Sequence, residues 1–434
     1  MTRERSDSDC GTVAIVGLGY VGLPLCGLFH RAGFRVIGID IDQAKIDMLT
    51  AGESYLRHLG ETDLIKPMLR HPGFIPTSDP ARSAEADAVL ICVPTPLSSS
   101  GEPDLQYVLQ TTRHIAQALK ARGRSQLVCL ESTTYPGTTR EQLKPILDAA
   151  EVAYDLAFCP ERVDPGRSEP PMHAIPKIVG GIDQASTGAA VSLYGHVFET
   201  VIPVASPDVA EAAKLMENVY RAVNIALANE MKVVLDRMGI NVWEVIEAAA
   251  TKPFGFQPFY PGPGLGGHCI PIDPFYLAWK ASQVGCDAQF IELAGRVNRS
   301  MPARVVDITL KALGHATHSG DGPRILVLGL AYKPNIDDVR ESPSFELISL
   351  FRQAGCRVEY SDPHVPHTHH MRHYGDLDMA SVPLTSAALS AYDAVVIATA
   401  HDAFDWKEIA TSARLIVDTR NAMRNFPNAP VVRA

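Results

Sequence analysis

The stretch that decides the fold is Thr12-Val-Ala-Ile-Val-Gly17-Leu-Gly19-Tyr20-Val21-Gly22. A short apolar run typical of a buried strand leads directly into a G-x-G-x-x-G turn, and a helical pattern of apolar residues follows over 23–31. A second apolar run, 34–39, ends at Asp40, at roughly the 20-residue spacing at which dinucleotide-binding folds place an acid. Strand, glycine turn, helix and strand in this order predict a doubly wound α/β domain.

The same stretch predicts a cofactor site. The three glycines allow a tight turn and bring a diphosphate close to the amino end of the helix, with Tyr20 and Val21 in the same turn. A carboxylate at Asp40 would accept hydrogen bonds from both ribose hydroxyls and repel a 2′-phosphate, so the sequence predicts NAD rather than NADP. A glycine turn that binds nothing is the alternative.

Polar residues follow three further strands of this domain. The apolar runs 86–93 and 126–130 precede Thr95 and Thr133, and a run near 156–158 precedes Glu161 and Arg162. Because ligands of open α/β sheets lie beyond the carboxyl ends of the strands, these side chains are candidates for contact with cofactor or substrate. Hydroxyls that satisfy local turns, and a surface ion pair between Glu161 and Arg162, are the structural alternatives.

A long helix is predicted in the middle of the chain. Ser206-Pro207-Asp208 is a helix start, and an apolar pattern continues without a break to Met238 before Gly239. At ~1.5 Å per residue this helix is roughly 45 Å long, so we expect it to bridge domains and to offer spare apolar surface to a dimer partner. Lys214 and Asn218 lie four residues apart on one face. A lysine that only extends to water is the alternative.

The segment 259–273 reads Phe-Tyr-Pro-Gly-Pro-Gly-Leu-Gly-Gly-His-Cys-Ile-Pro-Ile-Asp, which is too rich in glycine and proline for a helix or strand. Its glycines let the backbone approach a bulky group and offer N–H groups to an anion. Asp273-Pro274 is predicted to be the N-cap and first residue of a helix, which puts Cys269 just ahead of a helix terminus that favours a thiolate. A buried, unreactive Cys269 and a plain helix cap are the alternative.

The C-terminal third repeats the first. Arg324-Ile-Leu-Val-Leu-Gly329 echoes the first strand and turn, 355–362 echoes 33–40, 391–398 echoes 85–92, and 414–420 echoes 126–132. Lys333 and Arg420 stand at strand ends and suit a diphosphate ligand. The fold class is therefore α/β, with two Rossmann-like doubly wound domains joined by a long central helix and a helical dimerisation domain. We expect domains at 1–205, 206–300 and 301–434.

Composition limits the possible functions. The chain has 434 residues, a formal net charge of −10 and a pI near 5.8, which argue against a general nucleic-acid role. We expect no membrane span and no signal peptide, and eight scattered cysteines favour a cytoplasmic protein. Five histidines between 364 and 373 lack matched cysteines or acids, so a solvated loop is favoured over a metal site.

Taken together, the motifs resemble those of the UDP-glucose/GDP-mannose dehydrogenase family, the nucleotide-sugar 6-dehydrogenases. The resemblance covers nearly the whole chain and includes GLGYVGLP at 17–24, PTP at 94–96, ESTTYPGTT at 131–139, PER at 160–162, EAAKLMENVYRAVNIALANE at 211–230, PGPGLGGHCIPIDPF at 261–275, GLAYKPNIDDVRES at 329–342 and DTRN at 418–421. It implies a Rossmann NAD domain, a helical homodimer core and a C-terminal domain that closes over a nucleotide sugar.

The resemblance also implies residue roles. Cys269 matches the family's thiol nucleophile, and Lys214, Asn218 and Asp273 match its catalytic lysine, asparagine and aspartate. Thr133 matches the residue that orients water and contacts NAD, Thr95 a cofactor contact and Glu161 the loop glutamate. Positions that match substrate contacts are Glu161, Arg162, Lys214, Asn218, Phe259, Tyr260, Gly264, Gly266, Gly267, Lys333 and Arg420, and Arg340 matches a residue that reaches toward NAD.

The activity implied by the resemblance is NAD-dependent four-electron oxidation of the sugar C6 hydroxymethyl to a uronic acid, for polysaccharide or glycoside biosynthesis. The segments 54–58, 160–166 and 266–277 look like the UDP-N-acetylglucosamine branch, while UDP-glucose or TDP-glucose stay open. A two-electron 3-hydroxy acid dehydrogenase would need neither Cys269 nor a second nucleotide-binding unit. A catalytically silent nucleotide-sugar-binding protein would be expected to have lost Cys269 or Lys214.

Overall fold

The computed structural model describes residues 11–434 apart from 57–63, 99–100, 164–169, 268, 315–321, 369–373, 375–376 and the side chain of Cys269. His369, His370 and His373 therefore lie outside the described residues, as does most of the loop that follows Val163. The chain forms two compact units, Met1–Glu217 with Phe275–Cys286, and Asn218–Pro274 with Asp287–Ala434. The three-domain division expected from the sequence stays a prediction.

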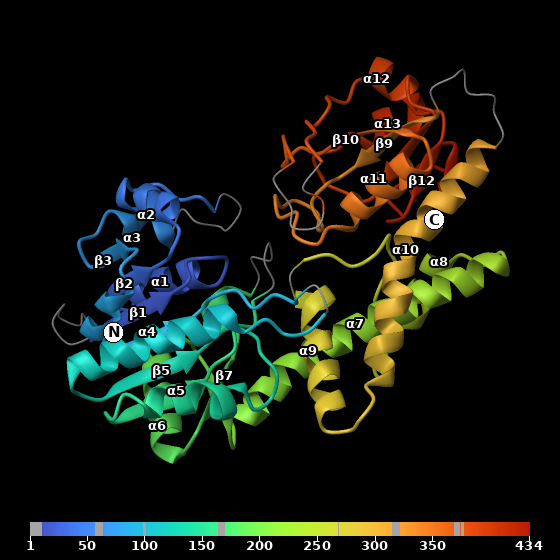
Figure 1. Cartoon of the computed structure of the whole chain (residues 1–434). Coiled ribbons are helices and arrows are strands. Elements are labelled where there is room, and N and C mark those ends of the chain that lie inside the picture. The colour runs from blue at the N-terminus through green and yellow to red at the C-terminus, as the bar shows by residue number, and fades with distance from the viewer. Residues whose placement is uncertain are drawn as a thin grey trace. The chain divides into compact units, whose positions relative to one another are not determined.

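The first unit is built on an eight-stranded sheet in the order β3-β2-β1-β4-β5-β6-β7-β8 (Figure 1). The strands are β1 (Thr12–Val16), β2 (Arg35–Ile39), β3 (Phe74–Thr77), β4 (Ala88–Ile91), β5 (Gln126–Leu130), β6 (Tyr154–Phe158), β7 (Lys177–Gly181) and β8 (Val201–Pro203). Six strands are parallel, β7 is antiparallel to β6, and β8 runs parallel to β7. This confirms the doubly wound domain, while β7 and β8 were not predicted.

Helices cover both faces of this sheet, which is why its central strands read as continuous apolar runs. On one face Val13 and Ile15 pack in the same core as α1 (Gly22–Arg31) and α6 (Gln184–Tyr194). On the other face Ala14 packs with α4 (Gln106–Arg122) and α5 (Lys144–Asp148). Two shorter helices, α2 (Gln43–Thr50) and α3 (Ile65–Leu69), lie near β3 (Figure 1).

The middle of the chain is helical. It contains α7 (Pro207–Arg237), α8 (Val242–Ala250), α9 (Cys269–Gln283) and α10 (Gln289–Leu313). With 31 residues, α7 is about 46 Å long at ~1.5 Å per residue, and it begins at the proline where the sequence predicts a helix start. None of the described helices combines the length and the apolar character needed to cross a bilayer.

The start of α9 differs from the prediction. The sequence placed Asp273 at the N-cap and Pro274 at the first helical position, but α9 begins at Cys269 and contains Pro274. The physical reason is that Asp273 accepts a hydrogen bond from Asn218 Nδ2 at 2.6 Å, so its carboxylate is directed to another helix. Cys269 consequently forms the first residue of α9 instead of preceding it.

The second unit contains a five-stranded parallel sheet in the order β10-β9-β11-β12-β13. Its strands are β9 (Arg324–Leu328), β10 (Arg357–Ser361), β11 (Ala394–Ile397), β12 (Ile416–Asp418) and β13 (Val431–Arg433), with α11 (Pro343–Gln353), α12 (Ser386–Ser390) and α13 (Trp406–Ser412). The neighbours β10-β9-β11-β12 repeat β2-β1-β4-β5 of the first sheet. The internal repeat read from the sequence is therefore confirmed, strand for strand.

Candidate active site

The glycine turn after β1 has the geometry of a diphosphate cradle. Gly17 has φ +94°, and a Cβ there would lie 2.7 Å from the Cys92 carbonyl oxygen. A Cβ on Gly22 would lie 1.9 Å from the Gly17 carbonyl oxygen, so α1 can begin this close to the strand only with glycine. A Cβ on Gly19 would meet no atom within 4 Å, which leaves the turn open on the side where a ligand approaches.

Asp40 lies at the carboxyl end of β2, as predicted. Its Oδ2 accepts from the Leu18 amide at 2.8 Å and lies 3.3 Å from Lys45 Nζ, and its Oδ1 accepts from the Asp42 amide. The Tyr55 hydroxyl donates to the Leu18 carbonyl in the same corner. The Asp40 carboxylate therefore stabilises the glycine turn and lies beside the Lys45 ammonium. Its remaining lone pairs are suited to accept hydrogen bonds from ribose hydroxyls.

Further predicted cofactor contacts of the first unit, Tyr20, Val21 and Thr95, follow its strands β1 and β4. Tyr20 packs against the core that contains α1, and Val21 immediately precedes that helix. Thr95 is 4% exposed in the turn after β4. The neighbouring Pro96 carbonyl accepts from the hydroxyl of Tyr276, a fully buried residue of α9, at 3.0 Å.

The segment after β5, which carries the partly buried Thr133, is held by a residue that the sequence did not single out. Glu211 of α7 accepts from the Gly137 amide at 2.6 Å and from the amide and hydroxyl of Thr139 at 2.9 and 2.7 Å. Burial raises the pKa of Glu211 to about 7, although these three donors favour the carboxylate. One turn before Lys214, α7 is thereby fixed to the loop that follows Thr133.

Glu161 and Arg162 do not form the surface ion pair that was considered as an alternative. Glu161 Oε1 accepts from the amides of Arg162 and Val163 at 2.7 and 3.0 Å, and its Oε2 lies 3.3 Å from the buried ammonium of Lys177. Arg162 donates to the Pro176 carbonyl at 2.8 Å and pairs with Glu217 of α7 at 2.6 Å. Both side chains anchor the start of their loop in this unit.

The two predicted catalytic residues of α7 are buried. Lys214 and Asn218 are each 6% exposed and lie one turn apart on the helix. Asp273, 1% exposed, accepts from Asn218, so α7 and α9 bring together two of the four predicted catalytic residues of the helical region. The side chain of Cys269 lies outside the described part of the chain, but its backbone begins α9 one turn before Asp273.

The glycines of the 259–273 segment pack against protein. A Cβ on Gly266 would lie 2.4 Å from Tyr332 Cβ, and Gly267 has φ +81° with the Tyr332 ring against it. The Gly267 amide donates to the Arg340 carbonyl at 2.9 Å, so the expectation that it binds an anion is wrong for this N–H group. Gly264, with φ +140°, lies against Pro343.

Two aromatic residues open this segment. Phe259 meets Tyr220 of α7 edge-on at 5.7 Å between ring centroids, and Tyr260 stacks on Trp243 of α8 at 5.4 Å. Phe259 is partly buried and Tyr260 is 46% exposed. One face of the Tyr260 ring is therefore covered by Trp243, while nearly half of the residue stays exposed.

The basic strand-end residues differ from one another. Arg420 follows β12, donates to the Ala398 carbonyl at 2.8 Å, and would contact a Cβ on Gly262 at 2.4 Å. Burial lowers the pKa of Arg420 to about 10, which leaves it a cation at neutral pH. Lys333 is partly buried in the turn after β9. Arg340 makes a two-pronged pair with Asp338, 2.6 Å at its shortest.

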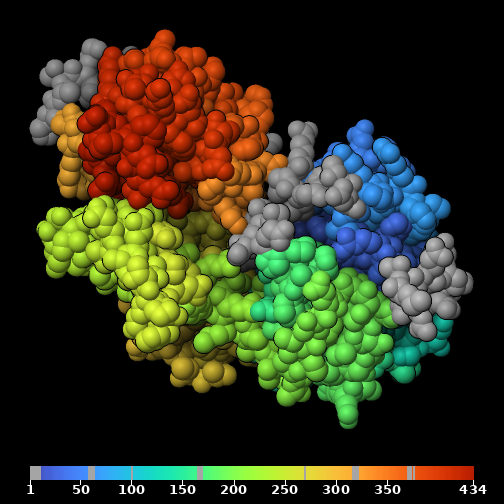
Figure 2. All heavy atoms as spheres, turned by 180° about the vertical axis from the view of Figure 1, so that it is seen from behind, coloured from blue at the N-terminus to red at the C-terminus, as the bar shows by residue number. Residues whose placement is uncertain are grey.

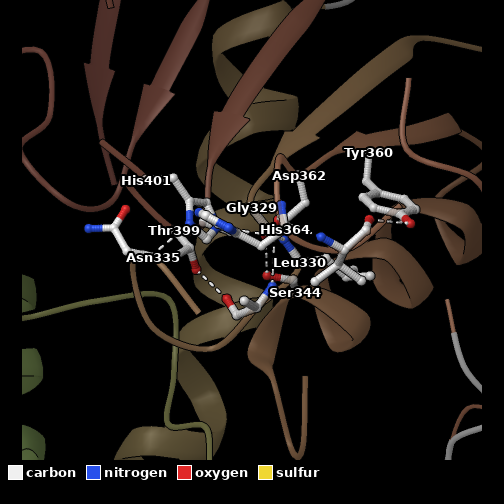
Figure 3. A network of polar contacts seen from close by, with 12 residues as sticks. Gly329, Leu330, Asn335, Ser344, Tyr360, Asp362, His364, Thr399 and His401 are labelled. Carbon is white, nitrogen blue, oxygen red and sulfur yellow. Dashed lines mark hydrogen bonds and ion pairs between the residues drawn. The ribbon is translucent and has the colours of Figure 1, made fainter. Parts of the chain in front are cut away.

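Asp362 occupies the position in the repeat that Asp40 occupies in the first sheet, but its oxygens are fully used (Figure 3). Its Oδ2 accepts from the amides of Leu330 and Ala331 at 2.6 and 3.0 Å and lies 3.0 Å from His401 Nε2. Its Oδ1 accepts two further amides, those of residues 364 and 365. Because five donors fill this carboxylate, the second sheet does not keep the acceptor capacity that is predicted to bind ribose at Asp40.

Sequence models of one family match most of the chain in three consecutive parts. They are the NAD binding domain at residues 11–198, the central domain at 208–300 and the UDP binding domain at 326–425 of UDP-glucose/GDP-mannose dehydrogenases. The chain belongs to the UDP-glucose/GDP-mannose dehydrogenase family. It is an NAD-binding oxidoreductase of the nucleotide-sugar dehydrogenases, and the cradle at Gly19 with Asp40 beside it fits that cofactor.

Individual relatives extend over almost the full length. The UDP-N-acetyl-D-mannosamine dehydrogenase of Methanococcus maripaludis is 34% identical and covers 97% of this chain and 95% of the relative. The solved structure of UDP-D-ManNAc dehydrogenase from Pyrococcus horikoshii has a TM-score of 0.85 at 32% identity, covering 97% and 98% of the two chains. A UDP-glucose dehydrogenase from Pyrobaculum islandicum has a TM-score of 0.87 at 28% identity, covering 98% and 97%.

Proposed function

We propose that this family member oxidises the C6 hydroxymethyl of a nucleotide-activated hexose to the carboxylate, in two oxidations that share Cys269. The observation that carries the proposal is the buried Asn218–Asp273 hydrogen bond, with Lys214 one turn earlier on α7 and Cys269 one turn earlier on α9. A thiol, an ammonium, an amide and a carboxylate, two of them on α7 and two on α9, are the groups that acyl chemistry at an aldehyde needs.

Each residue has a defined task in this proposal. Two NAD molecules, bound one after the other, would each accept one of the two hydrides that C6 gives up. A base removes the proton of the C6 hydroxyl in the first oxidation, and the Cys269 thiolate adds to the aldehyde carbon to give a thiohemiacetal. The second oxidation leaves a thioester on Cys269. Water then adds to its carbonyl carbon, the C–S bond breaks, and the carboxylate leaves with the thiol restored.

The polar side chains stabilise and orient these species. Lys214 and Asn218 would donate to the oxygen of the thiohemiacetal and to the oxyanion formed when water attacks, at about 3 kcal/mol for a preorganised donor. By the family resemblance, Thr133 would orient the attacking water and Asp273 would serve as the catalytic aspartate. The Asn218–Asp273 hydrogen bond fixes the amide so that its other N–H can face the reacting oxygen.

We infer that the substrate is a UDP-activated 2-acetamido hexose. The segment motifs favour UDP-N-acetylglucosamine. Two of the three relatives named above are UDP-N-acetylmannosamine dehydrogenases that align over nearly the whole chain, and the third is a UDP-glucose dehydrogenase. The UDP binding domain over 326–425 supports the uridine nucleotide. A two-domain 3-hydroxy acid dehydrogenase does not account for that domain. The direct assay is NADH production over UDP-N-acetylglucosamine, UDP-N-acetylmannosamine, UDP-glucose and TDP-glucose.

Substitution of the thiol tests the mechanism. Cys269→Ser is expected to bind NAD with the wild-type dissociation constant but to stop at the aldehyde or at an ester adduct, detected by mass spectrometry. Cys286→Ser is the matched control, since Cys286 is an exposed cysteine beyond the end of α9. Carboxylate formation by Cys269→Ser at the rate of the control would exclude Cys269 as the nucleophile.

We also propose that the chain forms a homodimer through α7. Large apolar side chains of this helix are exposed in the single chain at helical spacing: Met216, Tyr220, Leu227, Met231 and Val234. Further exposed apolar residues, Val245, Phe254 and Phe256, lie on α8 and the segment after it. Figure 2 draws this part of the chain in yellow-green. Large exposed apolar side chains repeated along one helix are typical of an interface, and a symmetric pairing with a second copy would cover them.

A further inference from the structure

Four side chains form a buried polar cluster beneath the carboxyl ends of β5 and β6. Lys177, at the first position of β7, places its Nζ 2.5 Å from Glu131 Oε2 and 3.3 Å from Glu161 Oε2. Tyr194 of α6 donates to the other oxygen of Glu131. Exposure is 1% for Lys177, 2% for Glu131, 7% for Glu161 and 0% for Tyr194, so the cluster is cut off from solvent.

Among these four side chains, Lys177 is the cation, and it lies between the carboxylates of Glu131 and Glu161. Burial opposes the charge on Lys177, but Glu131 and Glu161 outweigh it and raise the pKa of the ammonium, which stays protonated. Burial raises the pKa of Glu131 to about 7, although Lys177 partly offsets this. Buried ion pairs seldom stabilise a fold more than apolar residues of the same volume would. Stability alone is therefore a weak reason for three ionisable groups here.

The cluster does fix the position of two predicted catalytic residues. One oxygen of Glu161 is held by the amides of Arg162 and Val163, and only Lys177 among the contacts described here fixes the other. Glu131 stands two residues before Thr133, directly after β5. The same ammonium thus holds the segment that leads to Thr133 and the carboxylate of Glu161.

We propose that Lys177 is a positioning residue for the oxidation: its buried ammonium, braced by Glu131 and Tyr194, holds Glu161 and the Thr133 segment where the reacting sugar carbon needs them. The inference rests on the proposed function, because Glu161 and Thr133 have catalytic tasks only there. Lys177 itself touches neither sugar nor cofactor in this proposal. It acts through Glu161, whose carboxylate accepts hydrogen bonds from the Arg162 and Val163 amides at the start of the loop after β6.

The test removes the cation together with one of its two carboxylate partners. Lys177→Met alone leaves two buried carboxylates without their shared cation and can fail to fold, so the decisive variant is Lys177→Met/Glu131→Gln, compared with Glu131→Gln alone. Both lack the Glu131 charge, and they differ only in Lys177. Tyr194→Phe, which removes only the hydroxyl that braces Glu131, is the matched control.

We expect the double variant to bind NAD within twofold of wild type and to lose about 100-fold in kcat with little change in KM, as for a misplacement of about 1 Å in a catalytic group. Glu131→Gln and Tyr194→Phe are expected to stay within about fivefold of wild type. Hydrogen exchange at the Arg162 and Val163 amides should accelerate in the double variant, while that at Gly137, capped by Glu211, should not.

A double variant with the kcat of Glu131→Gln, or with unchanged exchange at both loop amides, would overturn the positioning role. If the double variant does not fold, Lys177→Arg decides: a guanidinium that retains both ion pairs should keep at least a tenth of wild-type kcat, and a 100-fold loss would count against the proposal. Failure of the proposed function is distinguishable, since it would appear in the wild-type enzyme as less than two NADH per sugar, whatever the Lys177 variants do.

Discussion

Replacing Asp362 by asparagine should strongly and selectively destabilise the second sheet. The carboxylate is 4% exposed and accepts from five donors: the amides of 330, 331, 364 and 365, and His401 Nε2. Asparagine has one carbonyl oxygen, so at least two buried donors would face an NH2 group instead of an acceptor. At about 1–3 kcal/mol for each unsatisfied donor, the expected loss in the free energy of unfolding is about 4 kcal/mol.

The loss should depend on pH in a defined direction. Burial alone would raise the pKa of Asp362, but the His401 and backbone hydrogen bonds outweigh it and hold the pKa below the ordinary value of 3.8. Because the folded-state pKa is depressed, the stabilisation is fully present above the unfolded-state pKa and is lost as the pH falls through the folded-state pKa. The difference between wild type and Asp362→Asn should therefore be constant from pH 8 to about 5 and shrink below about 4.

Trp406 provides a local probe for this measurement. Its ring meets Phe404, which in turn meets the His401 ring, each at 5.4 Å between centroids. Urea unfolding followed by fluorescence, in a background where Trp243 and Trp279 are phenylalanine, reports this sheet alone. Asp402→Asn is the control, since that exposed carboxylate pairs only with Asn335 among the contacts described and should change stability by less than about 1 kcal/mol. A loss below 1 kcal/mol for Asp362→Asn would refute the reasoning.

Three further predictions concern the functional groups. Asp40→Ala should weaken NAD binding at least about 10-fold, measured by calorimetry, because the glycine turn loses the acceptor of its Leu18 amide and the ribose loses a carboxylate; an unchanged affinity would contradict this. Asn218→Ala should lower kcat by about 10²–10³ and leave the NAD dissociation constant unchanged, and a wild-type kcat would remove Asn218 from the oxyanion site. Leu227→Arg should convert the dimer to monomer in light scattering, whereas Val284→Arg, at a residue 72% exposed beyond α9, should not; a dimer that survives Leu227→Arg places the interface elsewhere.

The sequence predicted the parts of the fold that local patterns determine. The G-x-G-x-x-G turn between strand and helix, the helix from Pro207 and the repeated strand order all depend on residues near one another in the chain. These are the features for which periodicity and turn chemistry carry most of the information. The family assignment followed from the same motifs and is confirmed by the match of all three family domains.

The sequence did not predict features that depend on distant partners. Asp273 followed by Pro274 has the pattern of a helix start, but Asn218, on another helix, takes the carboxylate and α9 begins earlier. Lys177 and Glu131 lie in apolar runs and become a cluster only when β5, β6 and β7 align. Glu211 accepts hydrogen bonds from the amides of Gly137 and Thr139, which lie much earlier in the chain. Their only local signal is a charged residue in or beside a run of buried apolar ones.

The chemistry itself is tested most directly by counting the NADH released for each UDP-sugar consumed by the wild-type protein, with the sugar limiting and NAD in excess. Two oxidations that share one thiol predict two NADH per sugar and a uronic acid as the product. One NADH per sugar, with an aldehyde or ketone as the product, would contradict the account.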